Sequence, residues 1–123
     1  MKMCEVLLID DDPIINLINA KVVKSQYPDL PVTALKSGIE ALEYIRKNST
    51  TPYLVFLDIH MPQMSGWEFI MNIQDDRMAE NLHIHILTSS VDNIDIMKAK
   101  ENSQVRSYLL KPLKADVLRS IAC

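Results

Sequence analysis

The sequence predicts an α/β protein built on a doubly wound parallel sheet of five strands. Short apolar runs alternate with longer segments of helical period, and the alternation occurs five times, as expected for repeated strand and helix units. The run Tyr53–Leu57 is continuously apolar, which is typical of a strand covered by helices on both faces. Of the 123 residues, 48% are hydrophobic and 24% are charged, as in an ordinary globular domain. We therefore expect one domain over residues 1–123.

The first two units are predicted from their strand pattern and from the residues that start their helices. A strand is expected at Glu5–Ile9, followed by a helix from Pro13 to about Gln26, because Asp12 is a good N-cap and proline suits the first helical position. A second strand is expected at Val32–Leu35. The helix after it begins at Ser37, since a serine with a glutamate three residues later predicts a capping box.

The third unit holds the predicted central strand, Tyr53–Leu57, then a loop over Met61–Gly66 and a helix over Trp67–Gln74. The last two units have the same order of strand and helix. They are expected as strands at His83–Leu87 and Ser107–Leu110 and as helices at Asn93–Glu101 and from Lys114 to the end.

Charge and composition exclude several classes of function. The formal net charge is −3, and no basic run is longer than two residues, so a surface for nucleic-acid phosphates is not expected. The first apolar run, Val6–Ile9, leads directly into three aspartates and is too short for a signal sequence or a membrane span. Cys4 and Cys123 lack metal or redox spacing, which predicts free thiols. A cytoplasmic location without membrane contact follows as the expectation.

Polar residues follow the predicted strands at the ends where a parallel sheet binds ligands. Asp10 and Asp11 follow the first strand, Asp58 the third, Thr88 the fourth and Lys111 the fifth. Carboxylates held close together repel one another unless a cation neutralises them. Their hard oxygens favour Mg²⁺, with Mn²⁺ as a substitute. A carboxylate beside such a metal, with a lysine and a threonine opposite, is arranged for a phosphoryl group on Asp58.

Taken in order, these motifs resemble the receiver domains of two-component response regulators, a family whose single-domain prototype is the chemotaxis regulator. The likeness covers essentially the whole chain and implies the flavodoxin-like (βα)₅ fold. Its carriers are the segments Val6–Pro13, Gly38–Leu42, Leu57–Glu68, Ile86–Ser89 and Tyr108–Pro112.

The resemblance implies a role for each matching residue at the acidic edge. Asp58 would be the phosphoacceptor, and Asp11 would bind Mg²⁺ directly. Asp10 would act on the metal mainly through water, and His60 would offer its backbone carbonyl. Thr88 would bind a phosphoryl oxygen.

The resemblance also implies a switch. Lys111 would pair with the acyl phosphate, and the Lys111–Pro112 peptide bond would be cis. Tyr108 matches the aromatic switch position, so that Thr88 and Tyr108 move together and reshape the face of the fourth helix, fifth strand and fifth helix. His60 and Ser90 occupy the positions expected to set the lifetime of the phosphoryl group.

The function that this resemblance implies is phosphorelay signal transduction, with no chemistry beyond self-phosphorylation and self-dephosphorylation. The donor would be a phosphohistidine on a sensor histidine kinase or a histidine phosphotransfer protein. Ile15 and Ile18, one turn apart on the first helix, are the candidate docking residues. Since the chain ends around the fifth helix, we expect no output domain and no nucleic-acid binding. Output then passes through a downstream protein, or the chain is a fragment.

Three alternatives use the same kind of sheet. A Mg²⁺-dependent aspartyl-phosphate phosphohydrolase needs a second carboxylate as acid and base, which Asp58-Ile59-His60 lacks. A flavin mononucleotide binder needs amides and hydroxyls after the first strand, where this chain has three aspartates. A receiver that acts unphosphorylated as a docking scaffold stays open, although the complete set of site residues argues against it.

Overall fold

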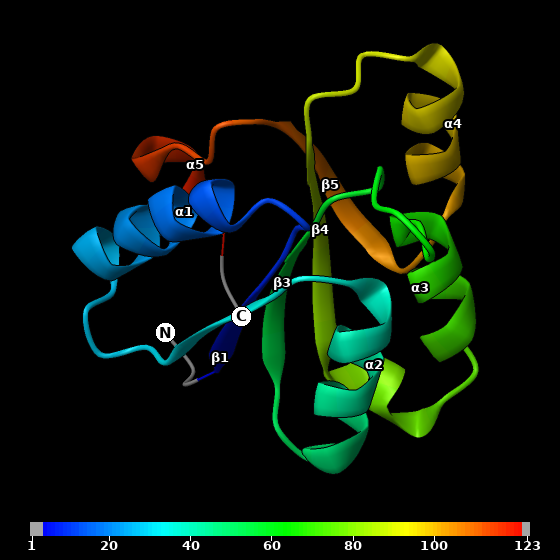
Figure 1. The fold of residues 1–123 in the computed structure, drawn as a ribbon, viewed down its shortest axis with the longest axis horizontal. Helices are drawn as coiled ribbons and strands as arrows, with labels where there is room; N and C mark the ends of the chain where they lie inside the picture. Colours follow the sequence, from blue (N-terminus) through cyan, green and yellow to red (C-terminus); the bar gives the residue numbers. More distant parts are fainter. Residues whose placement is uncertain (1–3, 122–123) are drawn as a thin grey trace.

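The computed structural model describes residues 4–121 and forms a five-stranded sheet with helices on both faces (Figure 1). The elements, in chain order, are β1 (Glu5–Ile9), α1 (Pro13–Gln26), β2 (Val32–Leu35), α2 (Gly38–Lys47), β3 (Tyr53–Leu57), α3 (Gly66–Ile73), the short 3-10 helix η1 (Arg77–Asn81), β4 (Leu82–Thr88), α4 (Asn93–Glu101), β5 (Val105–Leu110) and α5 (Ala115–Arg119). The fold class predicted from the sequence is confirmed.

All four strand pairs of the sheet are parallel, and the strand order is β2-β1-β3-β4-β5. β3 lies in the middle, and all five of its residues are buried, as its continuous apolar run predicts. The direction of winding reverses between β1 and β3. Loops that follow these two strands therefore diverge to opposite faces of the sheet, which opens a crevice at their carboxyl ends.

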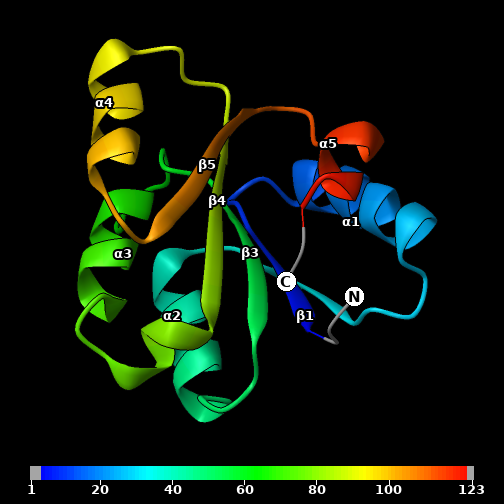
Figure 2. The ribbon, with the colours of Figure 1, turned by 180° about the vertical axis from the view of Figure 1, so that it is seen from behind.

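The helices divide between the two faces of the sheet. α1 and α5 cover one face, and α2, α3 and α4 lie on the other (Figures 1 and 2). The α2–α3 face is the apolar layer that includes Leu7, Val55 and Ile84 from the strands and Ile45 and Phe69 from the helices. The α1–α5 face contains a smaller apolar layer, built from Val6, Leu8, Leu54, Phe56, Val23 and Leu118 among others.

Local capping explains where the helices begin. The Asp12 carboxylate accepts hydrogen bonds from the backbone N–H groups of Ile14 at 2.9 Å and Ile15 at 3.4 Å, as expected for the predicted N-cap of α1. At α2, the Ser37 hydroxyl accepts from the Glu40 backbone at 3.1 Å. The complete reciprocal capping box instead occurs at α3, between Ser65 and Glu68, and was not predicted.

The predicted bounds of β4 and α3 differ from the structure by one residue at each end, and three larger differences occur. β5 begins at Val105, two residues before the predicted start, because its pairing with β4 shifts at a bulge next to Ile84 and His85. The segment Arg77–Asn81 forms a 3-10 helix that was not predicted, because it has no side-chain cap. Within the described residues, α5 covers only Ala115–Arg119.

The prediction of free thiols is wrong for Cys4, which is disulfide-bonded. Sequence separation carries no information on whether two sulfur atoms meet in space, and disulfide formation depends on that distance. Cys123 lies outside the described residues. Within residues 4–121, no helix combines the length and apolar character needed to cross a membrane.

Candidate functional site

The carboxyl ends of the strands bring three aspartates together. Asp10 and Asp11 directly follow β1, and Asp58 directly follows β3, which pairs with β1. One carboxylate oxygen from each lies within 4.8 Å of the others. Asp10 and Asp58 are buried, whereas Asp11 is exposed. The sequence prediction that these residues meet at one edge of the sheet is confirmed.

Lys111, which follows β5, reaches two of these carboxylates. Its Nζ donates to Asp10 Oδ2 at 2.6 Å and to Asp58 Oδ2 at 3.1 Å. Burial would lower the pKa of this lysine, but the two hydrogen-bonded carboxylates outweigh burial and raise it above its ordinary value. Lys111 is therefore a fixed positive charge against Asp58. The following peptide bond to Pro112 is cis, as expected.

The charge balance of this cluster fits a hard divalent cation. The formal charges of three carboxylates and one ammonium group sum to −2 in a partly buried site. Carboxylate oxygens of Asp10, Asp11 and Asp58 are the donor type that Mg²⁺ prefers, and Asp11 keeps the site open to water. The residues present therefore fit the magnesium ion that the sequence predicts.

Backbone contacts fix the loops that hold the aspartates. The Asp12 N–H donates to Asp10 Oδ1 at 2.9 Å, and the Asn16 side-chain amide donates to the Asp10 carbonyl at 2.9 Å. Gly66 passes so close to the loop after β3 that an added Cβ would lie 2.6 Å from the Asp58 carbonyl oxygen. Glycine is required there because only a residue without a side chain allows this approach.

A second set of contacts leads from β4 to β5. Thr88, the last residue of β4, is buried, and its hydroxyl oxygen accepts from the Ser90 N–H at 3.2 Å. The Tyr108 hydroxyl donates to the Ser90 carbonyl at 2.9 Å, and burial raises the pKa of this tyrosine. The threonine and the aromatic residue of the predicted switch thus contact the same short loop.

Asp95, in the first turn of α4, is a site residue that the sequence did not reveal. Its Oδ2 accepts from Ser90 Oγ at 2.8 Å and from His60 Nε2 at 3.1 Å, and its Oδ1 accepts from Trp67 Nε1 at 3.1 Å. Burial alone would raise the pKa of Asp95, but the three hydrogen bonds together lower it. In a sequence, an acidic residue in a first helical turn is already explained by its favourable interaction with the helix dipole. The position of Asp95 therefore gave no reason to expect a role in the site.

A family model described as the response regulator receiver domain matches residues 6–122. The chain belongs to this family. Its curated relatives include an uncharacterized response regulatory protein of Staphylococcus epidermidis (SERP2406), which is 36% identical over 120 residues, with 97% of this chain and 45% of that protein covered. The hybrid signal transduction histidine kinase D of Dictyostelium discoideum is 33% identical over 113 residues, with coverages of 92% and 7%.

Solved structures agree with this assignment. A two component response regulator from Cytophaga hutchinsonii superposes with a TM-score of 0.88 at 29% identity, covering 98% of this chain and 94% of that chain. The chemotaxis protein CheY4 of Vibrio cholerae shares the fold, with a TM-score of 0.80 at 22% identity and coverages of 97% and 95%. The receiver domain spans only a small part of some relatives, for example 14% of the sensor histidine kinase CheAY of Helicobacter pylori.

The predicted docking residues of the receiver domain lie on the first turns of α1, which follow the acidic loop. Ile18 is 46% exposed, and Ile15 is half-buried. Two further apolar side chains that the sequence did not single out, Ile14 and Leu17, are more exposed than either. The exposed apolar surface of α1 is thus formed by Ile14, Leu17 and Ile18, with Ile15 at its margin.

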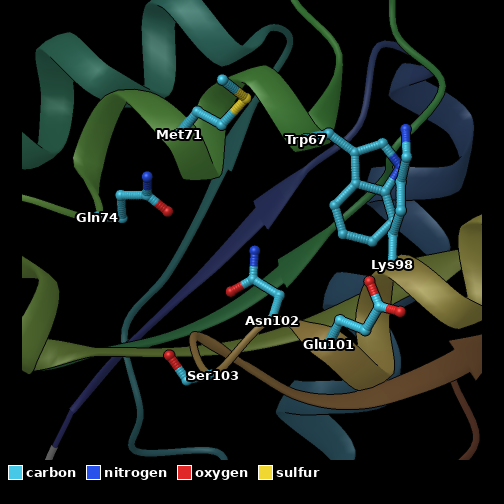
Figure 3. A pocket seen from close by; sticks show the side chains of 7 residues that line it. All are labelled: Trp67, Met71, Gln74, Lys98, Glu101, Asn102 and Ser103. Carbon is cyan, nitrogen blue, oxygen red and sulfur yellow. The ribbon is translucent and has the colours of Figure 1, made fainter.

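A groove of about 380 Å³ lies between α3 and the end of α4 (Figure 3). Trp67 and Met71 line it from α3, and Lys98 and Glu101 line it from α4. The Lys98 ammonium lies 5.8 Å from the centroid of the indole ring, within the range of a cation–π contact. This groove is separate from the acidic cluster.

Proposed function

We propose that this receiver domain accepts a phosphoryl group from a phosphohistidine donor onto Asp58. A carboxylate oxygen of Asp58 attacks the phosphorus atom, the bond between phosphorus and the donor imidazole breaks, and its electron pair stays on the donor nitrogen. The observation that supports this most directly is the contact of Lys111 Nζ with Asp58 Oδ2 inside a cluster of three carboxylates. That arrangement supplies positive charge where the phosphoryl oxygens would lie.

Each neighbouring residue has a defined task in this proposal. Asp10, Asp11 and Asp58, with the His60 carbonyl, would hold Mg²⁺ or Mn²⁺, which when bound supplies positive charge against the phosphoryl oxygens. Lys111 pairs with the phosphoryl group, and Thr88 donates its hydroxyl to a phosphoryl oxygen.

We also propose that phosphorylation changes the face formed by α4, β5 and α5, where a downstream protein binds. The contacts of Thr88 and Tyr108 with the Ser90 loop support a path from the site to α4. Large apolar side chains are exposed on and beside α4 and β5, as expected of a surface that binds a protein. They are Val91, Ile94, Met97 and Leu110.

The donor would dock on the apolar surface of α1, next to the acidic loop, where Ile15 and Ile18 lie. A histidine kinase or a histidine phosphotransfer protein in the cytoplasm is the expected donor. We expect no nucleic-acid binding by this chain, because its formal net charge is −3 and no basic run is longer than two residues.

The test is intact-mass measurement after incubation with Mg²⁺ and acetyl phosphate or phosphoramidate. The wild-type chain should gain one phosphoryl group, and Asp58→Asn should gain none. A matched control is Asp75→Asn, which removes the charge of an exposed aspartate just after α3 and should leave uptake unchanged. A wild-type chain that binds Mg²⁺ but takes up no phosphoryl group from small donors or a phosphohistidine protein would favour a docking scaffold instead.

A further inference from the structure

The carboxylate of Asp95 gathers side chains that flank the proposed phosphorylation site. His60 and Ser90, the two residues expected to set the lifetime of the phosphoryl group, both contact the same oxygen, Oδ2. The Asp95 side chain is only 10% exposed, whereas that of His60 is 67% exposed. A buried carboxylate therefore holds one edge of a ring that otherwise faces water.

The carboxylate also determines which ring nitrogen of His60 carries the hydrogen. An ionised carboxylate can only accept, so Nε2 must be the donor to Asp95 and Nδ1 is left as the acceptor of the neutral ring. Within residues 4–121, no hydrogen bond to Nδ1 is formed. This nitrogen is available to water.

The ring begins next to the phosphoacceptor. The backbone N–H of His60 donates to Asp58 Oδ1 at 3.3 Å. In a histidine, Nδ1 is closer to its own backbone than Nε2 is, and it is this backbone that contacts Asp58. Ser90 is less available, because its hydroxyl donates to Asp95 and accepts from the Asp92 N–H at 3.2 Å.

We propose that Asp95 is a positioning residue for hydrolysis of the acyl phosphate on Asp58. It holds the His60 ring so that Nδ1 accepts a hydrogen bond from the attacking water. The water oxygen forms a bond to phosphorus, and the bond between phosphorus and Asp58 breaks with its electron pair returning to the carboxylate. Both water protons leave with the dihydrogen phosphate product. This role rests on the proposed phosphorylation of Asp58.

The first measurement uses the unphosphorylated chain and determines which nitrogen of the His60 ring carries the hydrogen. Proton–nitrogen correlation spectra at about pH 8, above the usual range of imidazole charge, should show His60 with its hydrogen on Nε2. In Asp95→Asn the ring loses its charged acceptor, and signal should shift toward the form with hydrogen on Nδ1. A purely structural role of Asp95 in α4 would leave this signature unchanged, and an unchanged spectrum overturns the proposal.

The second measurement follows loss of the phosphoryl group by intact mass after the small donor is removed. We expect Asp95→Asn to slow hydrolysis by about tenfold, which is the rate equivalent of one hydrogen bond that orients the attacking water. His60→Ala should slow it similarly, and adding Asp95→Asn to His60→Ala should cause no further change. Asp92→Asn is the matched control, because it removes a charge three residues away and asparagine caps a helix equally well.

Two results would overturn the proposal while phosphorylation itself works. One is a rate in Asp95→Asn that is unchanged or faster. The other is an equal slowing by Asp95→Asn in the presence and absence of the His60 ring, which would mean that the carboxylate acts through α4. Failure of the wild-type chain to take up any phosphoryl group would instead overturn the proposed function, and this inference with it.

Discussion

The two faces of the sheet are built from different kinds of side chain. On the α2–α3 face, the larger of the two apolar clusters joins the strands to the helices. On the other face, α1 turns Asn16 and Asn19 toward the sheet, with exposures of 4% and 2%, and β4 adds His85 with 6%. Buried polar groups normally cost stability unless they are hydrogen-bonded.

The buried polar residues of the α1–α5 face help to position the acidic site. The Asn16 amide donates to the Asp10 carbonyl, so a polar residue in the α1 layer holds the loop that carries two of the aspartates. Within residues 4–121, the side-chain oxygens of Asn16 and Asn19 and the Nε2 atom of His85 have no hydrogen-bond partner. The α2–α3 face therefore contributes more to stability, whereas the α1–α5 face gives up part of its own stability to hold the loop that carries Asp10 and Asp11.

The largest expected effect is loss of an aromatic side chain from the α2–α3 face. Phe69→Ala removes a fully buried ring and should lower the free energy of unfolding by about 3 to 5 kcal/mol. Denaturant titration measures the change. The control Met71→Ala, on the same helix with a side chain 65% exposed, should change stability by less than about 0.5 kcal/mol. Equal losses of stability in Phe69→Ala and Met71→Ala would contradict the larger contribution of this face to stability.

A smaller effect is expected from the buried imidazole of the α1–α5 face. Burial, with help from Arg106 and His83, lowers the pKa of His85 from 6.5 to about 4. Between these values the unfolded chain binds a proton that the folded chain does not, so folding stability falls as the pH falls from 6.5 to 4. The loss from this residue approaches about 3 kcal/mol.

The comparison variant for this pH effect is His85→Leu, which cannot titrate. Carboxylates also titrate near pH 4, so the measured quantity is the difference in unfolding free energy between wild type and variant at each pH. Wild type should lose stability relative to His85→Leu on acidification. Parallel curves would contradict the buried, neutral state of this histidine.

The smallest expected effect distinguishes two buried asparagines of one helix. Within residues 4–121, both variants remove a side-chain oxygen that has no hydrogen-bond partner, and Asn16→Ala also removes the hydrogen bond to the Asp10 carbonyl. Both variants gain similar helix propensity, so their difference isolates the hydrogen bond. We expect Asn16→Ala to be about 1 kcal/mol less stable than Asn19→Ala in denaturant titration. The reverse order would mean that Asn16 does not support the acidic loop.

Much of the fold and of the acidic cluster could be predicted because the signals are local in sequence. The N-cap at Asp12, the apolar run of β3 and the polar residues after each strand all follow from neighbours in the chain. Parallel topology then brings Asp10, Asp58 and Lys111 to one edge without further information.

The remaining features depend on residues that meet only in space. Asp95 is 35 residues from His60 and 28 from Trp67, and no pattern along the chain links them. The bulge between β4 and β5 depends on how two strands pair, and the state of Cys4 depends on a distance between sulfur atoms. The groove beside Trp67 likewise forms only when α3 and α4 pack.

The central position of β3 in the sheet determines when its backbone amides become accessible to solvent. Its residues pair with β1 on one side and β4 on the other, so the backbone amides before Asp58 can exchange with solvent only when the sheet separates. In the described part of the chain, β5 lies at an edge of the sheet and pairs with β4. Hydrogen exchange should therefore be slowest just before Asp58 and faster along β5. On this expectation, the proposed phosphoacceptor Asp58 is anchored in the last part of the protein to open, and the proposed responding surface includes a part that opens earlier.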